Sequence, residues 1–244
     1  LENSKTFFVF KFSVAIFASL KWRKRMTQQE KVVAHVSQMI MTLGVKSVRM
    51  DDVAASLGMS KRTLYEMFGD KEELLYQSMI YLMQQHRRCM SQSVADCENI
   101  LEVLLRSVRL LGSYGRVKDM EKRLATNLKK FYPNVYNKIK RDHAEHGLAG
   151  LRYALDRCME EGYLDPTVDV ELMARLLLST SGTLLSEDNI VIPDEVSREE
   201  AFGAMVVNFL RGLASEKGLK IIDELLAREP RPMKLSERRK MNNN

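Results

Sequence analysis

The sequence predicts an all-α protein. Its 244 residues include only five prolines and twelve glycines, the residue types that most often end helices. Long stretches are rich in Leu, Met, Ala, Glu, Lys and Arg, which have high helix propensity. No stretch shows the sustained period-two pattern of β-branched residues that is typical of strands. With 45% apolar residues, the chain can bury a core as one large domain or as a small domain plus a larger one.

The first helix is expected to begin near Thr27 and to end at Gly44, because glycine readily follows the last turn of a helix. Its apolar residues recur at helical spacing and form one stripe: Val32, Val33, Val36, Ile40 and Leu43. Further helical patterns follow, separated by short breaks that contain Gly, Pro or Ser. We expect helices over residues 50–57, 60–68, 70–89, 98–112, 118–131, 134–162, 169–186, 197–214 and 218–228.

These patterns divide the chain into four predicted segments. They are a non-native or disordered extension (1–25), a small helical domain (26–89), a larger helical domain (90–228) and a basic flexible tail (229–244). The apolar run in the extension is shorter than the roughly 20 residues that a membrane-spanning helix needs. Its positive charges follow the run, whereas those of a signal peptide precede it. We therefore favour Met26 as the natural start, with a membrane anchor as the alternative.

The positive charge of the protein is concentrated near its ends. The net charge of the whole chain is +6, of which residues 21–49 contribute +6 and residues 228–244 contribute +4. Residues 50–227 contain 23 basic and 28 acidic side chains, a net charge of −5. Because basic ends are often simply solvated, this composition supports nucleic-acid binding only weakly.

The two short helices expected at 50–57 and 60–68 should pack against each other. Gly58 permits a sharp turn between them, and Ser60 is a favourable N-cap for the second. Apolar residues at helical spacing then face one another: Val53, Leu57, Leu64, Met67 and Phe68. The other face of the second helix contains Lys61, Arg62, Thr63, Tyr65 and Glu66. A helix of about eight residues is ~12 Å long and suits a DNA major groove ~12 Å wide, which indicates a helix-turn-helix.

A longer stretch, GVKSVRMDDVAASLGMSKRTLYEMFGDKEELL (44–75), closely resembles the N-terminal domain of the TetR family of transcriptional regulators. The similarity includes Ser60, Tyr65, Phe68 and the Lys71 that begins the next helix. It implies an N-terminal three-helix, helix-turn-helix DNA-binding domain with its motif at about 49–68. It also implies a larger helical domain for dimerisation and ligand binding.

The resemblance implies a set of DNA-binding residues: Ser47, Arg49, Ser60, Lys61, Arg62, Thr63, Tyr65 and Lys71. Lys61, Arg62 and Thr63 are expected to face base edges or nearby phosphates. Tyr65 should bind a phosphate through its hydroxyl, and Lys71 should bind another together with the amides at its helix start. Arg49 departs from the family, which often has Thr or Ser there. For each residue the alternative is a solvated surface side chain, but their gathering on one face favours DNA.

The helices expected near 170–185 and 200–213 are apolar over most of their circumference. Such helices must be covered on two sides. In the TetR family a two-fold four-helix bundle between subunits covers them, so the resemblance implies a homodimer through these helices. The alternative is that each helix is merely central in its own domain.

An effector pocket is expected among the helices of residues 98–162, where the candidate lining residues are Tyr114, Tyr136, His143 and Tyr153. A lone histidine on an apolar face is more often a core residue than a ligand contact. His143 and His146 lack the further ligands of a zinc site, and the chain has three cysteines without metal-type spacing, so no metal or cofactor is expected. The odd cysteine count also favours a reducing cytoplasm over a disulfide framework.

The sequence therefore predicts a cytoplasmic, homodimeric transcriptional regulator of the TetR type. It should bind a pseudo-palindromic double-stranded DNA operator as a repressor and leave it when a small-molecule effector binds. A membrane-anchored helical interaction module is one alternative. A helical enzyme is the other, but we find no nucleophile and base pattern, metal set or phosphate-binding glycine loop, so we do not expect an enzyme.

Overall fold

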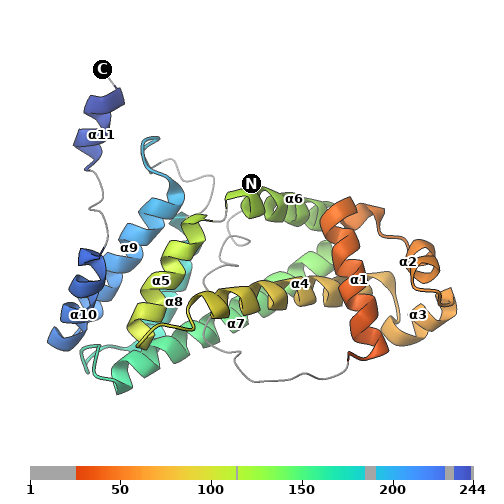
Figure 1. The fold of residues 1–244 in the computed structure, drawn as a ribbon, viewed down its shortest axis with the longest axis horizontal. Helices are drawn as coiled ribbons and strands as arrows, with labels where there is room; N and C mark the ends of the chain where they lie inside the picture. Colours follow the sequence, from red (N-terminus) through yellow and green to blue (C-terminus); the bar gives the residue numbers. More distant parts are fainter. Residues whose placement is uncertain (1–25, 114, 185–190, 229–233, 243–244) are drawn as a thin grey trace. The chain divides into compact units, whose positions relative to one another are not determined.

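The structure is a computed structural model that describes residues 26–113, 115–184, 191–228 and 234–242. Over these residues the chain forms eleven α-helices and one short 3-10 helix (Figure 1). In chain order they are α1 (Gln28–Leu43), η2 (Val45–Ser47), α2 (Met50–Ser56), α3 (Lys61–Phe68), α4 (Lys71–Ser93), α5 (Ile100–Ser113), α6 (Gly115–Phe131), α7 (Pro133–Glu160), α8 (Val170–Leu184), α9 (Arg198–Leu213), α10 (Glu216–Ala227) and α11 (Leu235–Asn242). The predicted all-α class is confirmed. The extension predicted over residues 1–25 lies outside the described residues.

The described chain forms two compact units. The first comprises residues 26–89 and 115–143, and the second comprises residues 90–113 and the described part of 144–242. The N-terminal segment of the first unit ends at residue 89, which is the position of the boundary predicted from the sequence. The observed division differs from the predicted larger domain over residues 115–143, because these residues pack with the N-terminal helices.

Local interactions fix both ends of α1. The Thr27 hydroxyl accepts a hydrogen bond from the Glu30 amide at 3.1 Å, and the Glu30 carboxylate accepts one from the Thr27 amide at 2.7 Å, which is a capping box. At the other end the Gly44 amide donates to the Ile40 carbonyl at 2.9 Å, and Gly44 has a φ of 80°. Leu43 does not belong to the buried stripe: it is the last residue of the helix and is 59% exposed.

α1 and α4 approach each other closely through two buried serines. Ser37 and Ser78 are 2% and 0% exposed. The Ser37 hydroxyl lies 2.6 Å from the Val33 carbonyl and 2.9 Å from the Ser78 carbonyl, and the Ser78 hydroxyl donates to the Leu74 carbonyl at 2.8 Å. Because both hydroxyls are bonded to backbone oxygens, the two polar side chains are buried without an unsatisfied donor.

α6 and the first part of α7 complete the first unit. Their buried residues are Leu124, Ala125, Leu128, Val135, Tyr136, Ile139 and His143. Two polar links join α7 to α4: the Lys138 ammonium lies 3.0 Å from the Glu73 carboxylate, and the Tyr76 hydroxyl donates to the Asp142 carboxylate. Burial, together with the Asp142 carboxylate, raises the pKa of Tyr76 to about 12, so this phenol remains a donor at neutral pH.

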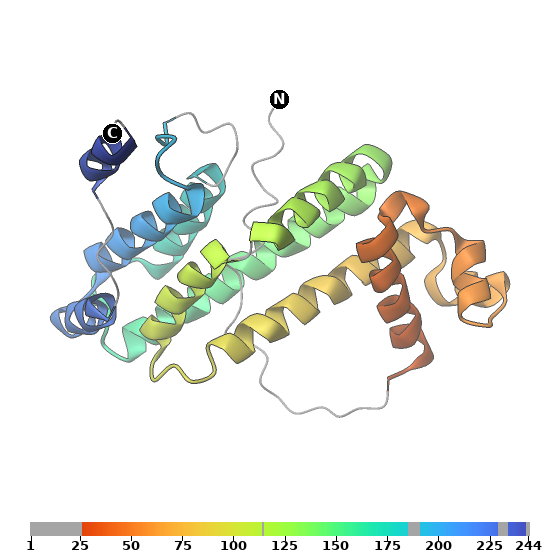
Figure 2. The ribbon, with the colours of Figure 1, turned by 45° about the horizontal axis from the view of Figure 1, so that its top comes forward.

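The core of the second unit is formed by α5, the later part of α7, and α8, α9 and α10 (Figure 2). Its most deeply buried side chains include Leu101, Leu155, Leu164, Leu177, Phe202, Leu210 and Ile222. α9 packs against both α5 and α8, and α10 packs against α5. The apolar patterns that predicted these helices therefore meet in one core.

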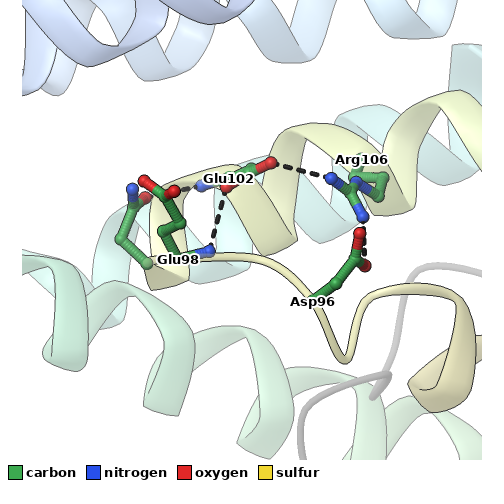
Figure 3. Close-up of polar contacts among 5 residues, drawn as sticks. Asp96, Glu98, Glu102 and Arg106 are labelled. Carbon is green, nitrogen blue, oxygen red and sulfur yellow. Dashed lines mark hydrogen bonds and ion pairs between the residues drawn. The ribbon is translucent and has the colours of Figure 1, made fainter.

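Charged side chains hold the connection between α4 and α5 (Figure 3). The Asn99 side-chain carbonyl caps α5 by accepting from the Glu102 amide at 2.9 Å. The Glu102 carboxylate accepts from the Glu98 amide at 3.0 Å and lies 2.8 Å from the Arg106 guanidinium, which also pairs with Asp96. Glu102 is only 8% exposed, so these bonds offset the cost of burying its charge.

The start of α10 packs tightly against the loop that follows α7. The Ser215 amide donates to the Tyr163 carbonyl at 2.9 Å, and the Asp165 amide donates to the Leu213 carbonyl at 2.9 Å. The Ser215 hydroxyl also caps α10 by accepting from the Gly218 amide at 3.1 Å. A Cβ at Gly218 would lie 2.1 Å from the Tyr163 carbonyl oxygen, so this position requires glycine.

Replacing Gly218 by alanine should therefore destabilise the second unit. The new methyl would displace a backbone carbonyl that already accepts a hydrogen bond, and overpacking of this kind costs about 1–3 kcal/mol. Urea unfolding would measure the loss. Gly203→Ala on α9 is the matched control, because a Cβ there would lie 3.7 Å from the Val108 side chain, an ordinary contact. Equal free energies of unfolding for the two variants would contradict the close approach.

α11 lies within the segment that the sequence predicted to be a basic flexible tail, residues 229–244. The Arg238 guanidinium pairs with the Glu200 carboxylate and donates to the Glu195 carbonyl at 3.0 Å. Arg239 lies 3.0 Å from the Glu195 carboxylate. The prediction is corrected over α11, because its arginines bind acidic residues around the start of α9.

Candidate nucleic-acid interface

α3 has one buried face and one exposed face. Leu64 and Phe68 are 0% and 4% exposed and pack into the first unit. The side chains on the opposite face are exposed or partly exposed: Lys61, Arg62, Thr63, Tyr65 and Glu66. Tyr65 is 42% exposed although it is aromatic. This is the division of faces that the sequence predicted.

The turn before α3 is fixed by Gly58 and Ser60. Gly58 has a φ of 62°, in the left-handed region that favours glycine. The Ser60 hydroxyl accepts from the Thr63 amide at 3.0 Å and lies 2.8 Å from the Thr63 hydroxyl. Ser60, which the sequence proposed both as a cap and as a DNA contact, is therefore seen here as the cap that sets where α3 begins.

Two exposed ion pairs orient the cationic side chains of α3. The Lys61 ammonium lies 2.9 Å from the Asp51 carboxylate of α2, and the Arg62 guanidinium lies 2.8 Å from the Glu66 carboxylate. The hydrogen bond and the charge of Asp51 raise the pKa of Lys61, which stays protonated at neutral pH. Exposed pairs of this kind are weak, so a phosphate or a base edge can replace either carboxylate. The sequence did not identify Asp51 as the partner of Lys61.

The segment between α1 and α2 exposes polar residues beside buried anchors. Val45 and Val48 are both 0% exposed. Lys46, Ser47 and Arg49 point outward from the same stretch, and Arg49 makes no side-chain cap to α2. The two flanking contacts predicted from the sequence, Ser47 and Arg49, are therefore accessible. Lys46 is a third exposed residue here that the sequence analysis did not select.

Lys71 begins α4, as predicted, and is partly buried. Its ammonium lies 5.2 Å from the centre of the Tyr132 ring, a cation–π contact with the residue between α6 and α7. One of the backbone amides expected to bind phosphate at the start of α4 already has an acceptor, since the Glu73 amide donates to the Asp70 carboxylate at 2.8 Å. Two groups were expected to bind phosphate here, the Lys71 ammonium and the backbone amides at the start of α4. The ammonium is the better placed of the two.

The second unit exposes one face of α8 and one face of α9. On α8, Leu172 and Leu176 are 48% and 46% exposed and lie one turn apart. On α9 the exposed positions are Ala204, Asn208 and Gly212, which share the same helical spacing. Leu177 is 1% exposed and belongs to the core of its own unit.

The four residues expected to line an effector pocket have different positions. Tyr136 and His143 are buried in the first unit, at 4% and 3% exposed. Tyr153 is 38% exposed in the second unit, and Tyr114 lies outside the described residues. A cavity of about 370 Å³ occurs in the first unit between α1 and α4, and its lining includes Thr27, Gln29, Val33, Tyr76, Gln77 and Tyr81.

An all-α fold with a capped, outward-facing α3 held by α2 defines the class of helix-turn-helix DNA-binding proteins. Residues 38–77 match the family model described as "Bacterial regulatory proteins, tetR family". Over these residues the chain is therefore similar to the DNA-binding domain of the TetR family of transcriptional regulators.

Solved structures of this family share the fold. A TetR-family regulator from Mesorhizobium loti has a TM-score of 0.55 at 19% identity, and the alignment covers 78% of this chain and 100% of that one. GusR from Salmonella enterica has a TM-score of 0.52 at 20% identity, with 77% and 100% covered. A TetR-family regulator from Cytophaga hutchinsonii has a TM-score of 0.55 at 12% identity, with 79% and 100% covered. No curated protein matches the chain.

None of the helices in the described part of the chain combines the length and the apolar character needed to cross a membrane.

Proposed function

We propose that the protein is a homodimeric transcriptional repressor that binds its operator through α3 and is released by a small-molecule effector. The observation that supports this most directly is the exposed face of α3, where two cations, a tyrosine and a hydroxyl lie opposite a fully buried apolar face. Lys61 and Arg62 face base edges or nearby phosphates, while Tyr65 and Lys71 bind phosphates. Ser47 and Arg49 contact the flanking backbone.

Dimerisation in this proposal uses the exposed faces of α8 and α9. Leu172 and Leu176, nearly half exposed on adjacent turns of α8, form an apolar strip that a partner subunit would cover. The exposed face of α9 includes the small residues Ala204 and Gly212, which allow a second helix to approach closely. A two-fold pairing of both helices buries all of these positions in one four-helix bundle.

Effector binding would act through α7. The proposed site is beside Tyr136 and His143, on the part of α7 that belongs to the first unit. This part is linked to α4 through Lys138 with Glu73 and Tyr76 with Asp142, and α4 begins with the phosphate-binding Lys71. A ligand that shifts α7 would therefore displace Lys71. Typical coupling of 1–3 kcal/mol would lower operator affinity by roughly 5- to 150-fold, and operator would weaken ligand binding equally.

Selection of random double-stranded DNA by the purified protein, followed by sequencing, tests the proposed function. Since two identical α3 helices must enter successive major grooves, the selected fragments should share a pseudo-palindrome. Its half-sites should be about one helical turn, ~34 Å, apart or slightly more. An Arg62→Ala variant selected in parallel should give a weaker motif. Failure to enrich any shared sequence, with folded and dimeric protein, would contradict the proposal.

A further inference from the structure

The turn between α6 and α7 is strongly basic in an otherwise acidic part of the chain. Residues 123–141 contain six Lys and Arg side chains and no Asp or Glu. By contrast, residues 50–227 as a whole have a net charge of −5. The basic stretch includes Lys129 and Lys130 in the last turn of α6, both of which are exposed. Within the residues that the structure describes, neither of these two lysines has an acidic partner.

The end of α6 contacts both segments that flank the helix-turn-helix. The Lys46 ammonium of η2 lies 5.2 Å from the centre of the Phe131 ring. The Lys71 ammonium at the start of α4 lies 5.2 Å from the centre of the Tyr132 ring. The Lys130 ammonium lies 5.4 Å from the Phe131 ring, which is itself 37% exposed. The end of α6 and the two flanking segments therefore form one surface in the first unit.

Among the residues that the structure describes, this surface gathers four lysines that form no ion pair: Lys46, Lys71, Lys129 and Lys130. Like charges held close together repel, and an incoming polyanion removes that cost. The two aromatic rings restrict the ammonium groups of Lys46 and Lys71, so less side-chain entropy is lost when a phosphate binds. A DNA backbone fits this chemistry, because it presents regularly spaced phosphates and because Ser47, a predicted flanking contact, is adjacent to Lys46 of the same surface.

We propose that residues 129–132, which are the end of α6 and the residue that follows it, form a second DNA-contacting segment. Lys129 and Lys130 bind backbone phosphates, in addition to the contacts made by α3. Phe131 and Tyr132 are positioning residues that hold Lys46 and Lys71 for the same backbone. This inference rests on the proposed DNA binding and adds a sequence-independent contact to it.

The double variant Lys129→Gln, Lys130→Gln tests the charge contribution. Its affinity for a mixed-sequence 40-base-pair duplex is titrated between about 50 and 200 mM salt, conditions in which phosphate contacts dominate. Each lost contact should reduce the log–log salt slope by about 0.9, so a dimer that loses four contacts should reduce it by about 3.6. Lys220→Gln, at an exposed lysine on α10, removes one positive charge from the other unit and should leave the slope unchanged.

A second pair of variants tests the positioning role of Tyr132. Tyr132→Phe keeps the ring over Lys71 and should bind the duplex like the unmodified protein. Tyr132→Leu removes the ring but keeps apolar packing, and it should bind several-fold more weakly at equal thermal stability. An unchanged slope in the double lysine variant, or equal affinities of the two Tyr132 variants, would overturn the inference while leaving the proposed function intact. If the unmodified protein did not bind the duplex at all, both this inference and the proposed function would fail.

Discussion

Replacing Leu176 by glutamate should convert the proposed dimer into monomers and abolish tight operator binding. Leu176 is 46% exposed on α8, one turn from the similarly exposed Leu172. In a two-fold interface the new carboxylates would be buried close to their symmetry mates, and a buried unpaired charge costs several kcal/mol. Losing the second half-site contact removes an affinity gain of about 10²–10⁴ that comes from linking two binding modules.

Sedimentation would measure the oligomeric state, and circular dichroism would show whether the variant is folded. Leu43→Glu is the matched control, because Leu43 is a leucine that is 59% exposed at the end of α1, in the unit that does not contribute to the proposed interface. It should remain dimeric. A folded Leu176→Glu protein that still sediments as a dimer would rule out this face of α8.

Removing Arg62 and removing Lys71 should weaken DNA binding in different ways. Arg62→Ala should relax base preference at one operator position by about 1–3 kcal/mol per half-site, because a guanidinium can bind a base edge in two places. Lys71→Ala should weaken binding to every sequence alike and reduce the log–log salt slope by about 0.9 per lost phosphate contact. The difference follows from the exposed position of Arg62 on α3 and the flanking position of Lys71 at the start of α4.

Titrations of each variant against the selected operator, single-base variants and mixed-sequence DNA would separate the two effects. Glu66→Gln is an informative control, since it frees Arg62 from its ion pair without removing the guanidinium. That variant should bind the operator at least as well as the unmodified protein. Equal, sequence-independent losses for Arg62→Ala and Lys71→Ala would show that the assigned roles are wrong.

Helix positions could be predicted from the sequence because they depend on local features. Gly44 and Gly58 have the positive φ that their sequence context suggested, and Ser60 caps α3. The direction in which each residue of an apolar helix points was harder to predict. Leu176 and Leu177 are adjacent and identical in kind, yet one is exposed and the other is buried. Only tertiary packing distinguishes them, and a charged residue at Leu177 would unfold the second unit rather than test an interface.

For the candidate site, the exposed face of α3 could be predicted, whereas the contacts between distant segments could not. The face follows from the spacing of Leu64 and Phe68 alone. The rings beside Lys46 and Lys71 come from residues 131 and 132, far along the chain, and no periodicity indicates such a pairing. The same reason explains why the sequence did not indicate that residues 115–143 pack with the N-terminal helices. Their own pattern shows that they are helical but not which neighbours they cover.

The junction at the start of α10 closes a loop in the second unit. The hydrogen bonds of Asp165 with Leu213 and of Ser215 with Tyr163 join the two ends of the segment that contains α8 and α9. The entropy cost of closing a loop grows slowly with its length, by only about 0.6 kcal/mol for each doubling. Because α8 and α9 are themselves part of the core, this low cost applies only to the length of the connection between the two helices. That connection could therefore change in length during evolution while the junction at the start of α10 and the core of the unit stay the same.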